Sequence, residues 1–172
     1  MDYLTEYNPD WPAWFLEIEH YLRPRLAGCL GIEHVGSTSV VGMAAKPIID
    51  IVMADGSMGG MIASVERAGY VHQGDLGITG REAFQASHEV TRRLPPHHLY
   101  ACEASSSELL KHLSFRQYLR AHPSETQRLT EFKCLLAFRQ RVSRGEYIEA
   151  KSPLVGEITA LALAWYGTYH DA

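Results

Sequence analysis

The sequence predicts a single α+β domain in which a strand-rich middle is flanked by helices and the C-terminal third is helical. The chain has 172 residues, of which 46% are hydrophobic and 21% charged, which is enough apolar material for one core. Short β-branched segments bounded by glycine and proline fill its middle, and helix-start signals fill its last third. We therefore expect residues 1–172 to form one domain.

The first predicted helix starts after Asp10, an N-cap candidate, and carries Pro12 in its first turn. Apolar residues then recur at helical spacing. Pro24 should bend or shorten this helix, and Gly28 or Gly31 should end it.

The strand-rich middle follows. In residues 46–53, "KPIIDIVM", alternation of side chains isolates Asp50 among apolar neighbours. A helix that ends at Gly69 is predicted after this segment. The strand candidates are residues 32–35, 46–53, 70–75, 81–87 and 97–102.

The C-terminal third predicts three helices. In the first two, a serine is followed three residues later by Glu or Gln, which is the pattern of a capping box, here starting at Ser105 and at Ser124. The first of them ends before Pro123, and the last helix starts at the Ser-Pro pair of residues 152–153. The predicted ranges are residues 105–122, 124–142 and 152–166.

Composition limits the classes of partner. Sixteen basic against twenty acidic residues give a formal net charge of -4, which offers no general attraction to nucleic acid or to an anionic membrane. The N-terminus lacks a basic start with an apolar run, and no apolar stretch approaches ~20 residues. We expect a soluble cytoplasmic protein without membrane or nucleic-acid partners. The three widely spaced cysteines predict buried free thiols, with no disulfide or zinc framework.

One stretch, "EHVGSTSVVGMAAKPIIDIVM" (residues 33–53), differs from the rest of the chain. After a strand it places Gly36, Ser37, Thr38 and Ser39, where glycine lets a phosphate approach the backbone and the hydroxyls can donate to it. The spacing matches neither a Walker A loop nor a dinucleotide fingerprint. The stretch is either an ordinary turn or an anion-binding turn.

Asp50 is the second unusual feature of this stretch. An acid centred in an apolar strand is costly to bury without a partner, a metal ion or an open site beside it. A structural interpretation gives it backbone amides, Lys46 or an arginine as partners. A functional interpretation makes it a catalytic or metal-binding acid.

These residues carry a family resemblance. "EHVGSTSVVGMAAKPIIDI", together with "HHLY", "LLKHLSFRQYLRAHP" and "YIEAKSP", resembles the GrpB family of the nucleotidyltransferase-fold superfamily. The resemblance implies a nucleotidyltransferase-like mixed β-sheet flanked by helices. It places a glycine-serine turn after the first strand, matched by Gly36 and Ser37, and a first acid on the second strand, matched by Asp50. It further implies a nucleotide or phosphorylated small molecule as ligand. Nucleotidyl transfer with Mg²⁺ or another divalent cation at Asp50 is the implied chemistry.

The sequence departs from the superfamily pattern at one position. Active members have a second acid two residues after the first, on the same strand face, and here that position is Val52. Two-metal transfer needs several carboxylate ligands. The alternative prediction is therefore a non-catalytic nucleotide- or phosphate-binding domain, or an accessory interaction domain. His98, Glu33 and Glu103 are the candidates to replace the missing acid.

His98 is the second candidate catalytic residue, because it matches the family's His-Leu pattern. Imidazole suits proton transfer or a transition metal better than Mg²⁺, and it can also hydrogen-bond a phosphate or a substrate hydroxyl. A structural histidine is the alternative. We expect His97 to be structural.

Four basic residues complete the predicted site. Arg116 and Arg120 lie one helical turn apart, so both can offer fork-shaped donors to one phosphate, although a solvated helix face gives the same pattern. The resemblance adds Lys46, just before the Asp50 strand, and Lys151, just before the last predicted helix. All four are predicted to bind phosphate or nucleotide.

Overall fold

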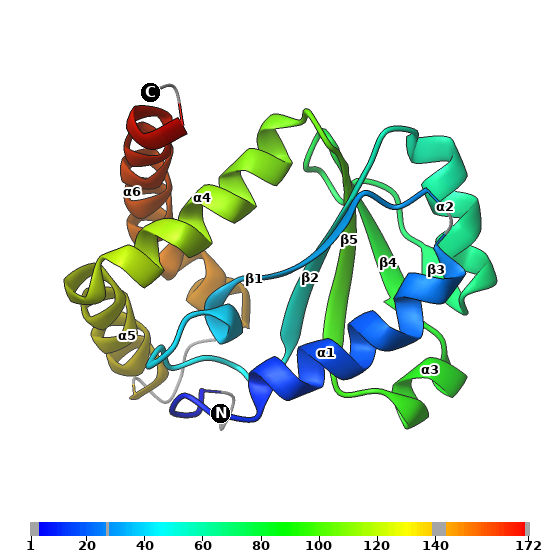
Figure 1. The fold of residues 1–172 in the computed structure, drawn as a ribbon. Helices are drawn as coiled ribbons and strands as arrows, with labels where there is room; N and C mark the ends of the chain where they lie inside the picture. The colour runs from blue at the N-terminus through cyan, green and yellow to red at the C-terminus, as the bar shows by residue number, and fades with distance from the viewer. Residues whose placement is uncertain (1–3, 27, 139–143, 171–172) are drawn as a thin grey trace.

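The computed structural model describes residues 4–26, 28–138 and 144–170, and a five-stranded mixed sheet lies at its centre (Figure 1). The strands lie in the order β1-β2-β5-β4-β3. They are β1 Gly31–Val35, β2 Ile49–Asp55, β3 Tyr70–His72, β4 Arg81–Ala86 and β5 His97–Glu103. The predicted fold class, a mixed sheet flanked by helices, is confirmed.

Helices surround the sheet and fill the C-terminal third, as predicted. They are α1 Trp11–Leu22, α2 Met58–Arg67, α3 His88–Arg93, α4 Ser107–Ala121, α5 Pro123–Phe138 and α6 Arg144–His170. Two 3-10 turns, Arg23–Arg25 and Ser37–Ser39, follow α1 and β1. Helices α4, α5 and α6 gather at one end of the molecule, beside the turn that follows β1 (Figure 1).

The centre of the sheet is the parallel pair β2 and β5. Asp50 lies opposite His98 and Val52 lies opposite Tyr100 in this pair. Strand β1 runs antiparallel to β2 and places Glu33 opposite Val52. Because paired residues share a face of the sheet, all five side chains project from the same face.

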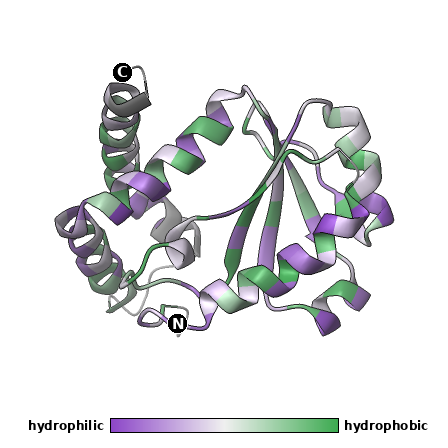
Figure 2. Cartoon of the chain, in the orientation of Figure 1, coloured by the Kyte–Doolittle hydropathy of each residue, from purple (hydrophilic) through white to green (hydrophobic). Residues whose placement is uncertain are grey.

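The opposite face carries the largest core. Ile49, Ile51 and Met53 of β2 are fully buried there, together with Trp11 of α1 and Met61 of α2. Burying a side chain of this size stabilises a fold by about 1.5–3 kcal/mol. Figure 2 shows hydrophobic and hydrophilic residues alternating along the helices, as expected when one side of a helix packs on a sheet.

Two smaller clusters hold the remaining helices. On the Asp50 face, α4 covers an apolar cluster of Val35, Val52, Ala54, Cys102 and Leu109. The other cluster packs the segment after β1 against α4, α5 and α6. Its buried members are Val40, Met43, Tyr118, Leu119, Leu129, Ile158 and Ala162.

Two helix starts differ from the sequence prediction. Asp10 occupies the N-cap position of α1, but its side chain makes no capping bond, because its backbone is already helical at φ -81 and ψ -13. Ser106, and not Ser105, caps α4: it has an extended backbone, and its hydroxyl accepts a hydrogen bond from the Leu109 N–H at 3.2 Å.

Three element boundaries also differ. Helix α3 was not predicted, and it is capped by Ser87, whose hydroxyl accepts from the Val90 N–H. Strand β3 ends at His72, before the predicted residue 75. Helix α6 starts at Arg144 and runs through Pro153, so Lys151 lies inside this helix and not before it. Residues 139–142 of the predicted second C-terminal helix lie outside the described residues.

The remaining physical predictions concern thiols and membranes. Cys102 is buried and Cys29 is half-buried, but Cys134 is exposed, and all three thiols are free. Within the described ranges, none of the helices combines the length and the apolar character that a membrane span requires.

Candidate functional site

The glycine-serine turn, residues 36–39, follows β1 and lies against Asp50. Gly36 has φ 68 and ψ -168, a conformation available essentially only to glycine. A Cβ atom at this position would lie 2.5 Å from Oδ2 of Asp50. The missing side chain of Gly36 therefore makes room for the carboxylate of Asp50 directly against the turn.

Only one of the three hydroxyl groups of the turn is available to the site. The Thr38 hydroxyl lies 2.9 Å from Nε2 of buried His34, and the Ser39 hydroxyl donates to the Gly36 carbonyl at 2.7 Å. Both side chains are buried and hold the turn together. Ser37 is half-buried, so it is the member of the predicted set that a ligand can reach.

Asp50 and His98 form a hydrogen-bonded pair at the centre of the sheet. Nδ1 of His98 donates to Oδ1 of Asp50 at 2.9 Å, and the side chains are 34% (Asp50) and 45% (His98) exposed. The bond occupies Nδ1 and leaves Nε2 as the imidazole nitrogen for a ligand or a proton. His97, predicted to be structural, has both ring nitrogens engaged, by the Tyr70 hydroxyl and the Pro95 carbonyl.

Lys133 of α5 reaches the turn from the helical end of the molecule. Its Nζ donates to Oγ of Ser37 at 2.6 Å and to the Ala44 carbonyl at 3.2 Å. Its side chain is buried, with 4% of the residue exposed. Burial and, to a smaller extent, the charge of Lys151 lower the pKa of Lys133 to about 7, against the opposing charge of Asp50.

Two further lysines complete a cationic group that we call the lysine cluster: Lys46, Lys133 and Lys151. Burial lowers the pKa of Lys151, while the charge of Asp50 raises it and that of Lys46 lowers it. Lys151 therefore lies within electrostatic range of the predicted acid, and Lys46 lies within electrostatic range of Lys151. We call the assembly of Ser37, Asp50, His98 and the lysine cluster the Asp50 site.

The sequence interpretation missed Lys133, although a signal was present. Lys133 lies four residues after Leu129 and three before Leu136, on the apolar stripe of its helix. Both leucines are buried. A lysine on a buried stripe needs a polar partner for its amine, and here the partner is the hydroxyl of Ser37.

The two predicted arginines contact the protein itself. Nη1 of Arg116 donates to Oε2 of Glu33 and to the His34 carbonyl, each at 2.8 Å. Nε and Nη2 of Arg120 both donate to the Ser39 carbonyl, at 3.0 and 2.8 Å. In the structure Arg116 thus contacts a carboxylate and a backbone carbonyl, and Arg120 contacts a backbone carbonyl, while a phosphate shared by the two stays a prediction. The pair fixes α4 to β1 and to the turn.

Val52, at the position of the missing acid, is closed to a ligand. Val52 is fully buried in the apolar cluster under α4. Glu33 shares its face but is bound by Arg116. Glu103 is five residues beyond His98 on β5, about 16 Å along an extended strand. Neither glutamate supplies a second free carboxylate beside Asp50.

The donor set around Asp50 does not fit the predicted divalent cation. Mg²⁺ takes several oxygen ligands, mostly carboxylates, phosphates and water. Across the described residues, no three His, Cys, Asp or Glu side chains are grouped so as to hold a metal ion. The lysine cluster adds positive charge at the place where a cation would have to bind.

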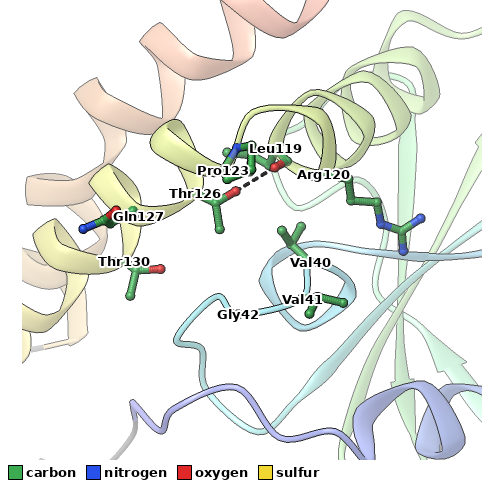
Figure 3. A pocket seen from close by; sticks show the side chains of 9 residues that line it. All are labelled: Val40, Val41, Gly42, Leu119, Arg120, Pro123, Thr126, Gln127 and Thr130. Carbon is green, nitrogen blue, oxygen red and sulfur yellow. Dashed lines mark hydrogen bonds between the residues drawn. The ribbon is translucent and has the colours of Figure 1, made fainter.

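A separate cavity of about 580 Å³ lies between the segment after the turn and the corner of α4 and α5 (Figure 3). Val40, Leu119 and Pro123 form apolar parts of its wall, and Arg120 is its one charged side chain. Asp50, His98 and Lys133 do not line it. Among the described residues, the predicted acid and histidine therefore belong to the Asp50 site and not to the lining of this cavity.

Comparison with known proteins shows relatives along nearly the whole chain. A family model described as GrpB protein matches residues 3–161. UPF0157 protein YqkA of Bacillus subtilis is 32% identical over 166 residues, which cover 92% of this chain and 46% of the relative. A UPF0157 protein of Pseudomonas aeruginosa is 34% identical over 167 residues, 91% of this chain and 66% of the relative. The chain thus spans less than half of the first relative and 66% of the second.

The fold has a solved counterpart. The crystal structure of conserved protein GrpB from Enterococcus faecalis superposes with a TM-score of 0.82 at 33% sequence identity. The match covers 95% of this chain and 98% of that chain. At this level of similarity, the two chains share the complete arrangement of sheet and helices.

Proposed function

The chain belongs to the GrpB family, and on that premise we propose that its Asp50 site binds a nucleotide or another phosphorylated small molecule. One observation carries the proposal: Lys133 and Lys151, two half-buried or buried lysines, lie with the Ser37 hydroxyl around a single carboxylate. Lys46 adds a third positive group in range of Lys151. A phosphate group can contact these lysines and this hydroxyl together.

Physical chemistry favours an anion at this position. Burial disfavours the charged form of a lysine, so grouping several lysines in a folded protein is costly unless an anion joins them. A phosphate can accept hydrogen bonds from ammonium groups and from a serine hydroxyl at once, and such charge-assisted bonds are the strong ones. We propose that Lys151 and Lys133 hold the phosphate and that Ser37 orients it.

A second candidate function is transfer of a nucleotidyl group, and the bond between Asp50 and His98 favours it. A carboxylate that holds Nδ1–H of an imidazole orients Nε2 to accept a proton. His98 is 45% exposed, so a substrate hydroxyl can reach it. In this candidate the proton of the acceptor hydroxyl passes to Nε2 of His98 while the phosphate stays on the lysines.

Ligand-induced stabilisation tests the binding proposal. Nucleoside mono-, di- and triphosphates and sugar phosphates are titrated into the protein with and without Mg²⁺, and the melting temperature is recorded. A ligand at 100 times its dissociation constant stabilises the protein by about 2.7 kcal/mol. Lys151→Met should weaken the binding of an active ligand at least tenfold. Lys111→Met, which changes an exposed lysine of α4, should not.

Asp50→Asn separates lysine-based from metal-based recognition. If the lysines hold the phosphate, the variant binds without Mg²⁺ as tightly as the native protein, or more tightly because a negative charge has gone. If binding requires Mg²⁺ and disappears in Asp50→Asn, the metal prediction replaces the proposal. The absence of stabilisation by every phosphate compound, in a folded protein, contradicts it. Product formation that survives His98→Gln contradicts the transfer candidate.

A further inference from the structure

Ser37 and Lys133 form a hydroxyl-amine pair at the edge of the Asp50 site. Nζ of Lys133 lies 2.6 Å from Oγ of Ser37, within the range found between a nucleophile and its base. The amine is buried, whereas the serine is half-buried and open to a ligand. A second bond, to the Ala44 carbonyl, fixes the direction of the amine.

The partners of Lys133 favour its neutral form. Both of its hydrogen-bond acceptors, a hydroxyl and a carbonyl, are neutral, and a buried ammonium without a bound carboxylate is costly. Lys151 of α6 also disfavours the ammonium, while Asp50 of β2 and the neighbouring Cys134 favour it. These effects together bring the pKa to about 7. In the neutral form of the amine, Nζ can accept the hydrogen bond of the Ser37 hydroxyl instead of donating to it.

We propose that Ser37 is a nucleophile activated by Lys133, and that it accepts the nucleotidyl group of a nucleoside triphosphate. The inference rests on the proposed function, because the phosphate held by the site is the electrophile. Oγ of Ser37 forms a bond to the α-phosphorus as the bond from that phosphorus to the β-phosphate bridge breaks. Pyrophosphate leaves with the electron pair, and the hydroxyl proton passes to Nζ of Lys133.

The second half of the reaction regenerates the site. The hydroxyl oxygen of an acceptor attacks the same phosphorus, and the bond from the phosphorus to Oγ breaks. The ammonium of Lys133 returns its proton to Oγ, and the acceptor proton passes to Nε2 of His98. Lys133 is thus the base for Ser37 in the first half of the reaction, and His98 is the base for the acceptor hydroxyl in the second half.

Chemical labelling tests the nucleophile without knowledge of the natural substrate. Phenylmethylsulfonyl fluoride reacts with activated serines: the bond from Oγ to sulfur forms, fluoride leaves, and the base takes the proton. Intact-mass and peptide-mapping mass spectrometry should show one adduct, on Ser37, whose rate of formation rises as the pH passes through about 7. Ser37→Ala should abolish the adduct, and Ser105→Ala, at an exposed serine, should not.

Lys133→Arg identifies the base. Arginine keeps a positive charge and donors for Ser37 and Ala44, but it does not give up its proton. Labelling should fall by a factor of about 10² or more, as for loss of a general base, and should lose its rise with pH. Circular dichroism and the melting temperature establish that each variant is folded. Labelling at another serine, or an unchanged rate in folded Lys133→Arg, overturns the inference.

Protection by nucleotides separates this inference from the proposed function. A nucleotide that binds and slows labelling supports both. Nucleotide binding without any adduct on Ser37 overturns the nucleophile and leaves the binding site. An adduct on Ser37 that no phosphate compound slows supports the nucleophile and contradicts phosphate as the ligand.

Discussion

Gly36 shows how the absence of one side chain positions the acid of the site. We predict that Gly36→Ala destabilises the protein, because a side chain in the left-handed region costs about 1–2 kcal/mol and a forced contact costs about 1–3 kcal/mol more. The contact is the 2.5 Å approach to Asp50. Urea unfolding measures the loss.

Gly42→Ala is the matched control for this prediction. Gly42 also has a positive φ, 81, but an added Cβ would meet nothing within 4 Å. This variant should lose only the conformational part, about 1–2 kcal/mol. Equal losses in the two variants would contradict the contact between Gly36 and Asp50.

Some residues of the candidate site could be predicted from the sequence, and others could not. Gly36, Ser37, Asp50 and His98 come together as the motif implied, because adjacent strands carry them in register. For Lys133, the apolar stripe of its helix indicates burial but not the partner, because the partner lies 96 positions away in the chain. Tertiary packing decides which partner the amine of a buried lysine reaches, and the spacing of residues in the sequence does not show that partner.

At the scale of elements, helix α4 lies across the Asp50 face and holds β1 and the turn after it in place. Arg116 is its buried anchor and satisfies the carbonyl of His34. We predict that Arg116→Gln lowers the free energy of unfolding by about 1–3 kcal/mol, the cost of leaving a buried acceptor without its donor. It should also weaken ligand binding, since the turn loses support from α4. Urea unfolding and the ligand-induced change in melting temperature measure the two effects.

Arg128→Gln provides the control, since Arg128 of α5 is an exposed arginine that pairs with Glu125 and Glu157. Exposed ion pairs contribute little, so this variant should unfold at nearly the native urea concentration. If Arg116→Gln behaves in the same way, α4 does not depend on this anchor.

The elements themselves followed from local signals, while their ends did not. Strands β1 and β2 formed in β-branched segments, and β4 and β5 formed between breaks made by glycine, proline and charged residues. Helix α3 was missed because six residues are too few to show a helical period. The start of α6 was missed because Pro153 was taken for a helix start, although packing of neighbouring helices lets the helix continue through it.

The whole molecule should respond to acid through His34. Its ring stacks on Phe15 of α1 with centroids 5.0 Å apart, so it joins α1, β1 and the turn. Burial lowers the pKa of His34 to about 4, with smaller lowering by Arg120 and Arg116 against the opposing charge of Asp50. Between pH 6.5 and 4, His34 is therefore protonated in the unfolded chain and neutral in the folded protein. The free energy of unfolding falls as the pH falls through this range.

His34→Gln checks this prediction. The variant cannot take up the proton, so its urea midpoint should fall less than that of the native protein between pH 7 and pH 4.5. Part of the fall should remain, because burial also lowers the pKa values of His97 and His112. An identical decline in both proteins would show that His34 does not cause it.

The parallel pairing of β2 with β5 has a consequence for folding order. Asp50 and His98 are 48 residues apart in the chain and touch only when these strands are in register. Closing a loop of that length costs chain entropy before any contact can offset it, so such non-local pairings slow folding. The hydrogen bond between Asp50 and His98 is thus absent from any intermediate in which the sheet's centre is open. Unfolding that separates β2 from β5 therefore disrupts the centre of the sheet and the hydrogen bond between Asp50 and His98 in the same event.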